Sequence, residues 1–215
     1  MNNKTKKLAT IAALCAIAYV LAAVGRIPII LFLKYDPKDI VIAIGGLIFD
    51  PLTSFLIALI VSLVEMVTIS EIGIFGCLMN IISSCSFACT AAFIYRKKRK
   101  LSVAIVGLFC GWGCMAFAML LWNYLVTPFY MGYPRETVAE LLIPVFLPFN
   151  LIKGGLNTAI TMILYKPVIT ALRRSHLIDT AQTMEKSKSN IGVILTALFI
   201  IVTCILFILS LKGIF

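Results

Sequence analysis

The sequence predicts an all-α integral membrane protein, and three observations lead to that prediction. Of the 215 residues, 61% are hydrophobic and only 13% are charged. The apolar residues are gathered into runs, several of which reach the roughly 20 residues that a helix needs to cross a bilayer. Lys and Arg cluster beside these runs, as is typical at the ends of membrane-spanning helices. Together these features exclude an ordinary soluble domain and a disordered chain.

Hydropathy predicts seven apolar segments, at residues 8–32, 38–49, 51–70, 73–95, 101–128, 141–172 and 191–211. The first begins like a secretory signal, but its apolar character continues to Leu33 without a clear cleavage site. We therefore expect it to be a membrane-spanning helix. The second is short for a full crossing. Asp50 and Pro51 separate it from the third, because proline cannot continue a helix.

The distribution of positive charge predicts the orientation of these segments. Five consecutive basic residues, 96–100, separate the fourth segment from the fifth, and Arg173 and Arg174 close the sixth. With the amino terminus in the cytoplasm, 13 of the 19 Lys and Arg lie on the cytoplasmic side, as the positive-inside rule favours. We expect a cell-membrane protein with a six-span domain at 1–174, a polar cytoplasmic linker at 175–190 and an additional transmembrane helix at 191–215.

Polar residues inside the sixth segment mark a candidate site. Asn150, Lys153 and Asn157 are spaced three and four residues apart, so they share one helical face. An ionisable or amide side chain is costly in hydrocarbon unless it faces protein or water. This face is therefore expected to be wet or to bind a ligand. In the structural alternative, Lys153 pairs with Glu65 or Asp36 to brace the bundle, and the asparagines join helices.

A second polar group lies near the outer end of the fifth segment. Asn123 and Tyr124, followed by Pro128 and Tyr130, offer amide and hydroxyl groups beside aromatic rings. Such a combination suits a flat heterocyclic ligand. Tyrosines also gather at membrane interfaces as anchors, so the pattern alone leaves both interpretations open.

Small residues recur at helical spacing in two segments. The first carries several Ala-x-x-x-Ala repeats, including Ala12 and Ala16, which would let another helix approach closely. That helix could belong to the same bundle or to a partner. Gly107 and Gly111 repeat the spacing in the fifth segment, where packing within the bundle is the expected use.

Missing motifs exclude several classes of function. The chain has no Gly-x-x-x-x-Gly-Lys-Ser/Thr loop for ATP, and no His-Glu-x-x-His or Gly-x-Ser-x-Gly motif. His176 is the sole histidine beside seven cysteines, which leaves a zinc site without plausible partners. The net charge of +10 lies beside the apolar segments and not in a nucleic-acid-binding patch. We expect no enzymatic activity, no metal site and no nucleic-acid partner.

In four places the chain resembles the substrate-binding S components of energy-coupling factor (ECF) vitamin transporters, and among them the riboflavin-specific branch. The similar stretches are the alanine-rich residues 14–19, the loop at 33–39, the region of Asn123, Tyr124, Pro128 and Tyr130, and Pro-Phe-Asn-Leu-Ile-Lys-Gly at 148–154. The last is the most specific. The resemblance extends over about residues 6–174.

This resemblance implies a six-helix bundle that binds a vitamin near its extracellular face. The vitamin would pass inward when the bundle docks on a transmembrane coupling protein driven by two ATPases. Riboflavin would be the transported ligand, with no cofactor, and Ala12 and Ala16 would form the docking surface. The implied ligand contacts are Asp36, Asn80, Asn123, Tyr124, Asn150 and Lys153.

Two features depart from the family pattern. Val61, Ser62 and Glu65 stand where family members often carry a lysine and an asparagine, and the seventh segment lies outside the usual six. The alternatives are therefore an S component for another vitamin or for a flavin such as FMN, or an ion-coupled secondary carrier. In the carrier, Glu65 and Lys153 would form a titrating pair.

Overall fold

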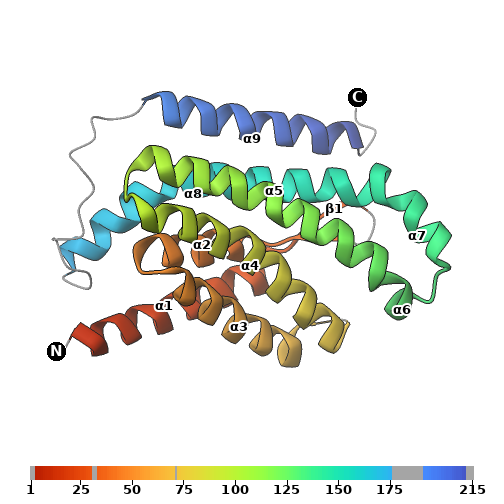
Figure 1. The fold of residues 1–215 in the computed structure, drawn as a ribbon, viewed down its shortest axis with the longest axis horizontal. Helices are drawn as coiled ribbons and strands as arrows, with labels where there is room; N and C mark the ends of the chain where they lie inside the picture. The colour runs from red at the N-terminus through yellow and green to blue at the C-terminus, as the bar shows by residue number, and fades with distance from the viewer. Residues whose placement is uncertain (1–2, 31–32, 71, 176–190, 212–215) are drawn as a thin grey trace.

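The protein is a bundle of long helices with one small β-hairpin (Figure 1). The structure, a computed structural model, describes residues 3–30, 33–70, 72–175 and 191–211. Six helical stretches in this part of the chain are long and apolar enough to cross a membrane, which confirms the predicted all-α membrane class. The elements are α1 (Asn3–Val24), β1 (Ile27–Ile30), β2 (Leu33–Tyr35), α2 (Lys38–Ile48), α3 (Pro51–Thr68), α4 (Gly73–Lys97), α5 (Leu101–Leu125), α6 (Thr127–Met131), α7 (Arg135–Leu141), a π-helical turn (Leu142–Phe146), α8 (Leu147–Arg174) and α9 (Ile191–Leu211).

The first segment is shorter than hydropathy predicted. Helix α1 ends at Val24, and the apolar residues that follow form an antiparallel hairpin in which Ile27 pairs with Tyr35 and Pro28 with Lys34. The expectation of a helix through residue 32 is therefore wrong. Isoleucine is β-branched and favours strands, and Pro28 cannot donate the backbone hydrogen bond that a helix interior needs. Hydropathy alone does not distinguish such a strand from a helix.

Helix α2 is the short second segment, and it lies inside the bundle. All 11 of its residues are buried, and its length of roughly 16 Å is about half of a hydrocarbon core. At its carboxyl end, Asp50 caps α3 by accepting a hydrogen bond from the Thr53 backbone N–H at 2.7 Å. Lys7 in α1 forms an ion pair with Asp50 at 2.7 Å. The amino-terminal part of α1 and the α2–α3 turn therefore lie at the same end of the bundle.

Helices α4 and α5 approach closely through the glycines that the sequence analysis singled out. A Cβ added to Gly111 would lie 2.3 Å from the carbonyl oxygen of Phe87, and one added to Gly107 would lie 2.7 Å from that of Ala91. Both contacts are far inside van der Waals distance. The prediction that this pair serves packing within the bundle is confirmed.

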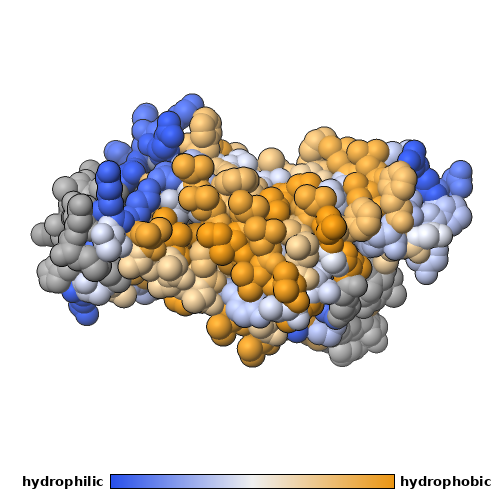
Figure 2. Space-filling model, turned by 90° about the horizontal axis from the view of Figure 1, so that it is seen from below, coloured by the Kyte–Doolittle hydropathy of each residue, from blue (hydrophilic) through white to orange (hydrophobic). Residues whose placement is uncertain are grey.

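Helix α9 lies along α8 at the edge of the bundle, on the side away from α1 (Figure 1). Its buried residues are Ala197 and Cys204, and most of its other side chains are exposed. The predicted seventh segment is thus a helix; nearly all of the predicted linker, from residue 176 to 190, falls outside the described residues. Figure 2 shows an apolar surface across the middle of the molecule and hydrophilic residues towards its ends, as expected of a protein embedded in lipid.

Candidate ligand-binding site

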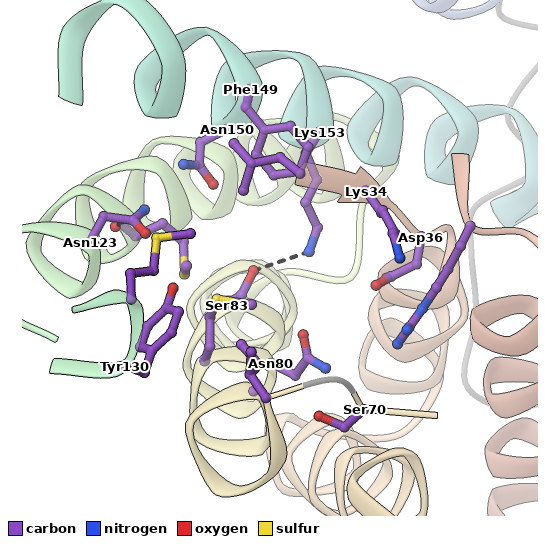
Figure 3. Close-up of a pocket in the computed structure, with 17 residues that line it drawn as sticks. Lys34, Asp36, Ser70, Asn80, Ser83, Asn123, Tyr130, Phe149, Asn150 and Lys153 are labelled. Atoms are coloured by element: carbon purple, nitrogen blue, oxygen red, sulfur yellow. Dashed lines mark hydrogen bonds between the residues drawn. The ribbon is translucent and has the colours of Figure 1, made fainter. Parts of the chain in front are cut away.

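A cavity of about 250 Å³ opens among the hairpin, α4, α5, α6 and α8 (Figure 3). Its wall combines apolar side chains, including Phe149 and several methionines, with a limited set of polar groups. This is the usual composition of a small-molecule site, in which a few polar groups fix the orientation of the ligand. The polar residues that line it are Arg26, Lys34, Asp36, Ser70, Asn80, Ser83, Asn123, Tyr130, Asn150 and Lys153.

Five of the six predicted ligand contacts line this one cavity: Asp36, Asn80, Asn123, Asn150 and Lys153. They are separated by up to 117 residues in the sequence and come from the loop after β2 and from three helices. The sixth, Tyr124, lies outside the cavity lining and is 39% exposed. Consecutive helical residues point about 100° apart, so a helix that turns Asn123 inward turns Tyr124 away. The ring of Tyr130 lines the cavity instead.

Lys153 is held at the cavity wall by two polar partners. Its ammonium lies 3.1 Å from Asp39 Oδ2 and donates a hydrogen bond of 3.3 Å to Ser83 Oγ (Figure 3). The structural alternative expected Glu65 or Asp36 as the direct partner, and Asp39 takes that place. The reason is the burial of α2, which brings Asp39 against α8.

Asp39 is itself fixed by further hydrogen bonds. It accepts one from Ser84 Oγ in α4 and one of 3.2 Å from Asn157 Nδ2 in α8. Asn157 in turn accepts a 3.0 Å hydrogen bond from the Tyr35 hydroxyl. Burial raises the pKa of Tyr35, and the carboxylates of Asp39 and Asp36 raise it further, so the phenol stays protonated and donates. The residues on the predicted polar face of α8 therefore differ in role. Asn150 and Lys153 line the cavity, whereas Asn157 lies outside the lining and hydrogen-bonds to Asp39 and Tyr35.

The two cavity asparagines are oriented by their own helices. Asn123 Nδ2 donates to the carbonyl oxygen of Met119 at 2.7 Å, and Asn150 Nδ2 donates to that of Phe146, also at 2.7 Å. Phe146 closes the π-helical turn before α8; such turns often occur at functional sites. With each amide nitrogen engaged by the preceding turn, the orientation of both side chains is fixed before a ligand arrives.

Asp36 carries an unused acceptor in the cavity wall. Among the described residues, its buried Oδ1 has no hydrogen-bond partner, while Oδ2 lies 3.7 Å from Lys38 Nζ. Burial by itself raises the pKa of Asp36, but the positive charges of Lys38, Lys153 and Arg26 outweigh it and lower the pKa below its usual value. The carboxylate is therefore ionised. A buried ionised oxygen without a donor is costly, so a hydrogen-bond donor in the cavity, from water or from a bound molecule, would stabilise it.

Glu65 lies behind the cavity and connects three elements. Its carboxylate accepts hydrogen bonds from Lys38 Nζ at 2.6 and 2.8 Å and from Asn80 Nδ2 at 2.8 Å, and Arg26 lies 3.6 Å away. The direct Glu65–Lys153 pair that the secondary-carrier alternative requires is not formed, because each of these residues has another partner of opposite charge.

Sequence reasoning missed four polar residues of the cavity wall, and it missed Asp39 as the support of Lys153. The four are Arg26, Lys34, Ser70 and Ser83. Ser83 follows Asn80 by three residues, so helical spacing could have placed both on one face. Arg26 lies between α1 and β1, and its position depends on the hairpin that hydropathy did not predict. Asp39 is the last residue of the loop expected at 33–39, whereas the structure places it on the buried helix α2.

The chain is similar to known proteins along most of its length. The chain is 29% identical over 181 residues to the riboflavin transporter RibU of Staphylococcus aureus, a match that covers 80% of this chain and 95% of the relative. It is 27% identical over 190 residues to the riboflavin transporter FmnP of Bacillus subtilis, covering 81% and 99%. A solved structure described as the S component of a bacterial ECF transporter superposes with a TM-score of 0.67 at 29% identity, covering 80% of this chain and 99% of that one.

The family comparison covers most of the bundle. The model of the family described as "ECF transporter, substrate-specific component" matches residues 6–165, which include every polar residue of the cavity wall; α9 lies beyond the match. The resemblance seen in the sequence is therefore confirmed, and the chain belongs to the family of substrate-specific components of ECF transporters.

Proposed function

We propose that this protein binds riboflavin at the cavity and delivers it inward as the S component of an ECF transporter. The observation that carries the proposal is the unpaired, ionised Asp36 oxygen in a cavity that also brings together Asn80, Asn123, Asn150 and Lys153. The names of the relatives, two riboflavin transporters among them, support the choice of ligand.

The wall of the cavity suits the two parts of riboflavin. The isoalloxazine ring is flat, with carbonyl and nitrogen groups along one edge, and the amides of Asn123 and Asn150 together with Lys153 offer partners for such an edge. Phe149 and the neighbouring methionines offer apolar contact to the faces of the ring. The ribityl chain carries hydroxyl groups, and one of them can donate the hydrogen bond that Asp36 Oδ1 lacks. The chain thus acts by recognition and orientation, and we assign it no catalytic step.

Docking on the coupling protein is assigned to α1. Ala12 and Ala16 are exposed there, and larger apolar side chains flank them, with Leu8 69% and Ile17 51% exposed. A surface of small residues lets a second helix come close. Helix α9 lies on the other side of the bundle and leaves this surface free (Figure 1). The partners are the transmembrane coupling protein and two ATPases. The amino terminus and the basic 96–100 connection face the cytoplasm of a cell membrane.

The test is a titration of the protein, purified in detergent without ligand, with riboflavin. Bound flavin should show quenched fluorescence, with one binding site per chain. An unchanged fluorescence at micromolar protein and ligand would contradict the proposed ligand. Docking is tested separately by replacing Ala12 and Ala16 with leucine. This change should abolish riboflavin uptake by the assembled transporter and leave riboflavin binding by the isolated chain intact.

A further inference from the structure

The buried charges around the cavity are balanced. Among the residues that the structure describes, the ion pairs link three acids to three bases: Lys153 with Asp39 at 3.1 Å, Lys38 with Glu65 at 2.6 Å and with Asp36 at 3.7 Å, and Arg26 with Glu65 at 3.6 Å. Lys34 also lines the cavity, and because it is exposed it is not counted among these ion pairs. The three acids and three bases of the network therefore cancel in formal charge.

Glu65 is the acid on which this balance depends most. It is 1% exposed and accepts from Lys38, which is fully buried, while also facing Arg26. Without the Glu65 charge, the six-residue network would hold one excess positive charge. Lys38 would keep its ion pair with Asp36 at 3.7 Å.

We propose that Glu65 is a specificity-determining residue, whose negative charge balances the buried ion-pair network beside the cavity and thereby favours an uncharged flavin over its phosphate ester. The inference rests on the proposed function. A phosphate monoester brings about 1.5 to 2 negative charges at neutral pH. The cations of the ion-pair network are already matched by acids, so those charges meet no excess positive charge there and lose part of their hydration. Rejection by an unmatched charge is an established route to specificity.

Glu65 does not line the cavity, so its action on the ligand passes through other residues. It fixes the amide of Asn80 through the 2.8 Å hydrogen bond and lies beside Arg26, and both of these residues do line the cavity. Substitutions at Glu65 therefore affect both position and charge. The experiment must separate the two effects.

The experiment measures the ratio of the dissociation constants for FMN and riboflavin, by fluorescence titration of ligand-free protein. Glu65→Gln keeps the shape and an acceptor but removes the charge, so the ratio should fall on the order of tenfold. Lys38→Met removes a positive charge, and the ratio should rise. The double variant Lys38→Met/Glu65→Gln restores the balance, and its ratio should return to that of the wild type.

Asp50→Asn is the matched control. It removes one acidic charge at the start of α3, about 20 Å along the helix from Glu65, and asparagine caps a helix as well as aspartate does. Its ratio should equal that of the wild type. If Asp50→Asn shifts the ratio as much as Glu65→Gln does, the effect belongs to overall charge and the inference fails.

The opposite shifts expected for the two single variants keep the test decisive even if one of them fails to fold. A wild-type ratio in whichever of Glu65→Gln and Lys38→Met folds would overturn the role of Glu65, while riboflavin binding by the wild type would still support the proposed function. Absence of riboflavin binding by the wild type itself would count against the proposed function.

Discussion

Helices α8 and α9 lie side by side and cover similar lengths of the bundle, yet they differ in almost every other respect. Half of the spanning stretch that includes α8 is buried in the protein, against 11% for α9. Helix α8 carries Asn150 and Lys153, which line the cavity, and Asn157, which donates to Asp39 of α2. Helix α9 carries no charged side chain. In a membrane bundle, polar residues on a buried face therefore indicate the helix that lines a ligand site. Apolar length alone does not identify that helix.

The largest effect is expected from Lys153→Met on α8. Removal of the ammonium leaves Asp39 buried without its counter-charge, a loss of about 3–5 kcal/mol, and removes a charged donor from the cavity. Riboflavin binding should weaken by about 100-fold or more in fluorescence titrations.

The double variant Lys153→Met/Asp39→Asn separates folding from recognition in that result. It removes both charges, so thermal stability in detergent should recover towards that of the wild type while riboflavin binding stays weak. Recovery of binding together with stability would mean that Lys153 only braces the bundle.

A smaller effect is expected where α8 meets α5. A Cβ on Gly154 would lie 2.0 Å from Cδ1 of the Trp112 ring, so Gly154→Ala forces α8 and α5 apart. Overpacking of this kind costs about 1–3 kcal/mol, and the displaced neighbour Lys153 should bind riboflavin less tightly. Both are measured in detergent, by thermal unfolding and by titration.

Gly155→Ala is the adjacent control on the same helix. It tests the contact of α8 with α9, whereas Gly154→Ala tests the contact of α8 with α5. Its Cβ would lie 3.0 Å from Cys204 Sγ of α9, a contact that a peripheral helix can relieve by a small shift. Gly155→Ala should therefore leave riboflavin affinity within about twofold of the wild type. A larger loss than that of Gly154→Ala would show that α9 shapes the site.

The smallest effect is expected from the exposed face of α9. Phe199 is 73% exposed, and Phe199→Ala should change neither the stability by more than about 0.5 kcal/mol nor the riboflavin affinity. Cys204→Ala, in the α8–α9 contact, should cost about 1 kcal/mol of stability and leave affinity unchanged, because only packing is lost. A clear loss of binding in either variant would contradict a peripheral role for α9.

Much of this site could be predicted because buried polar residues are rare in membrane helices. The spacing of Asn150, Lys153 and Asn157 placed them on one face without knowledge of the fold. Asn123 was singled out as a polar residue of the fifth segment, and the family resemblance added Asp36 and Asn80 as ligand contacts. Close packing through Gly107 and Gly111 was also predictable, because helical spacing can be read within a single segment.

The features that the sequence did not predict depend on contacts between elements far apart in the chain. Hydropathy cannot tell an apolar strand from a helix, so strands β1 and β2 were missed, and with them the position of Arg26. The pairing of Lys153 with Asp39 follows from burial of the short helix α2, which no spacing within either segment reveals. Tyr124 was expected in the site because its neighbour Asn123 was, yet the helix turns the two in different directions.

Native mass spectrometry of protein purified from riboflavin-supplied cells tests most directly whether the polar face of α8 exists to hold a flavin. We predict one riboflavin adduct per wild-type chain and none on a folded Lys153→Met/Asp39→Asn double variant. A wild-type chain without any flavin adduct, or equal adducts on both proteins, would contradict it.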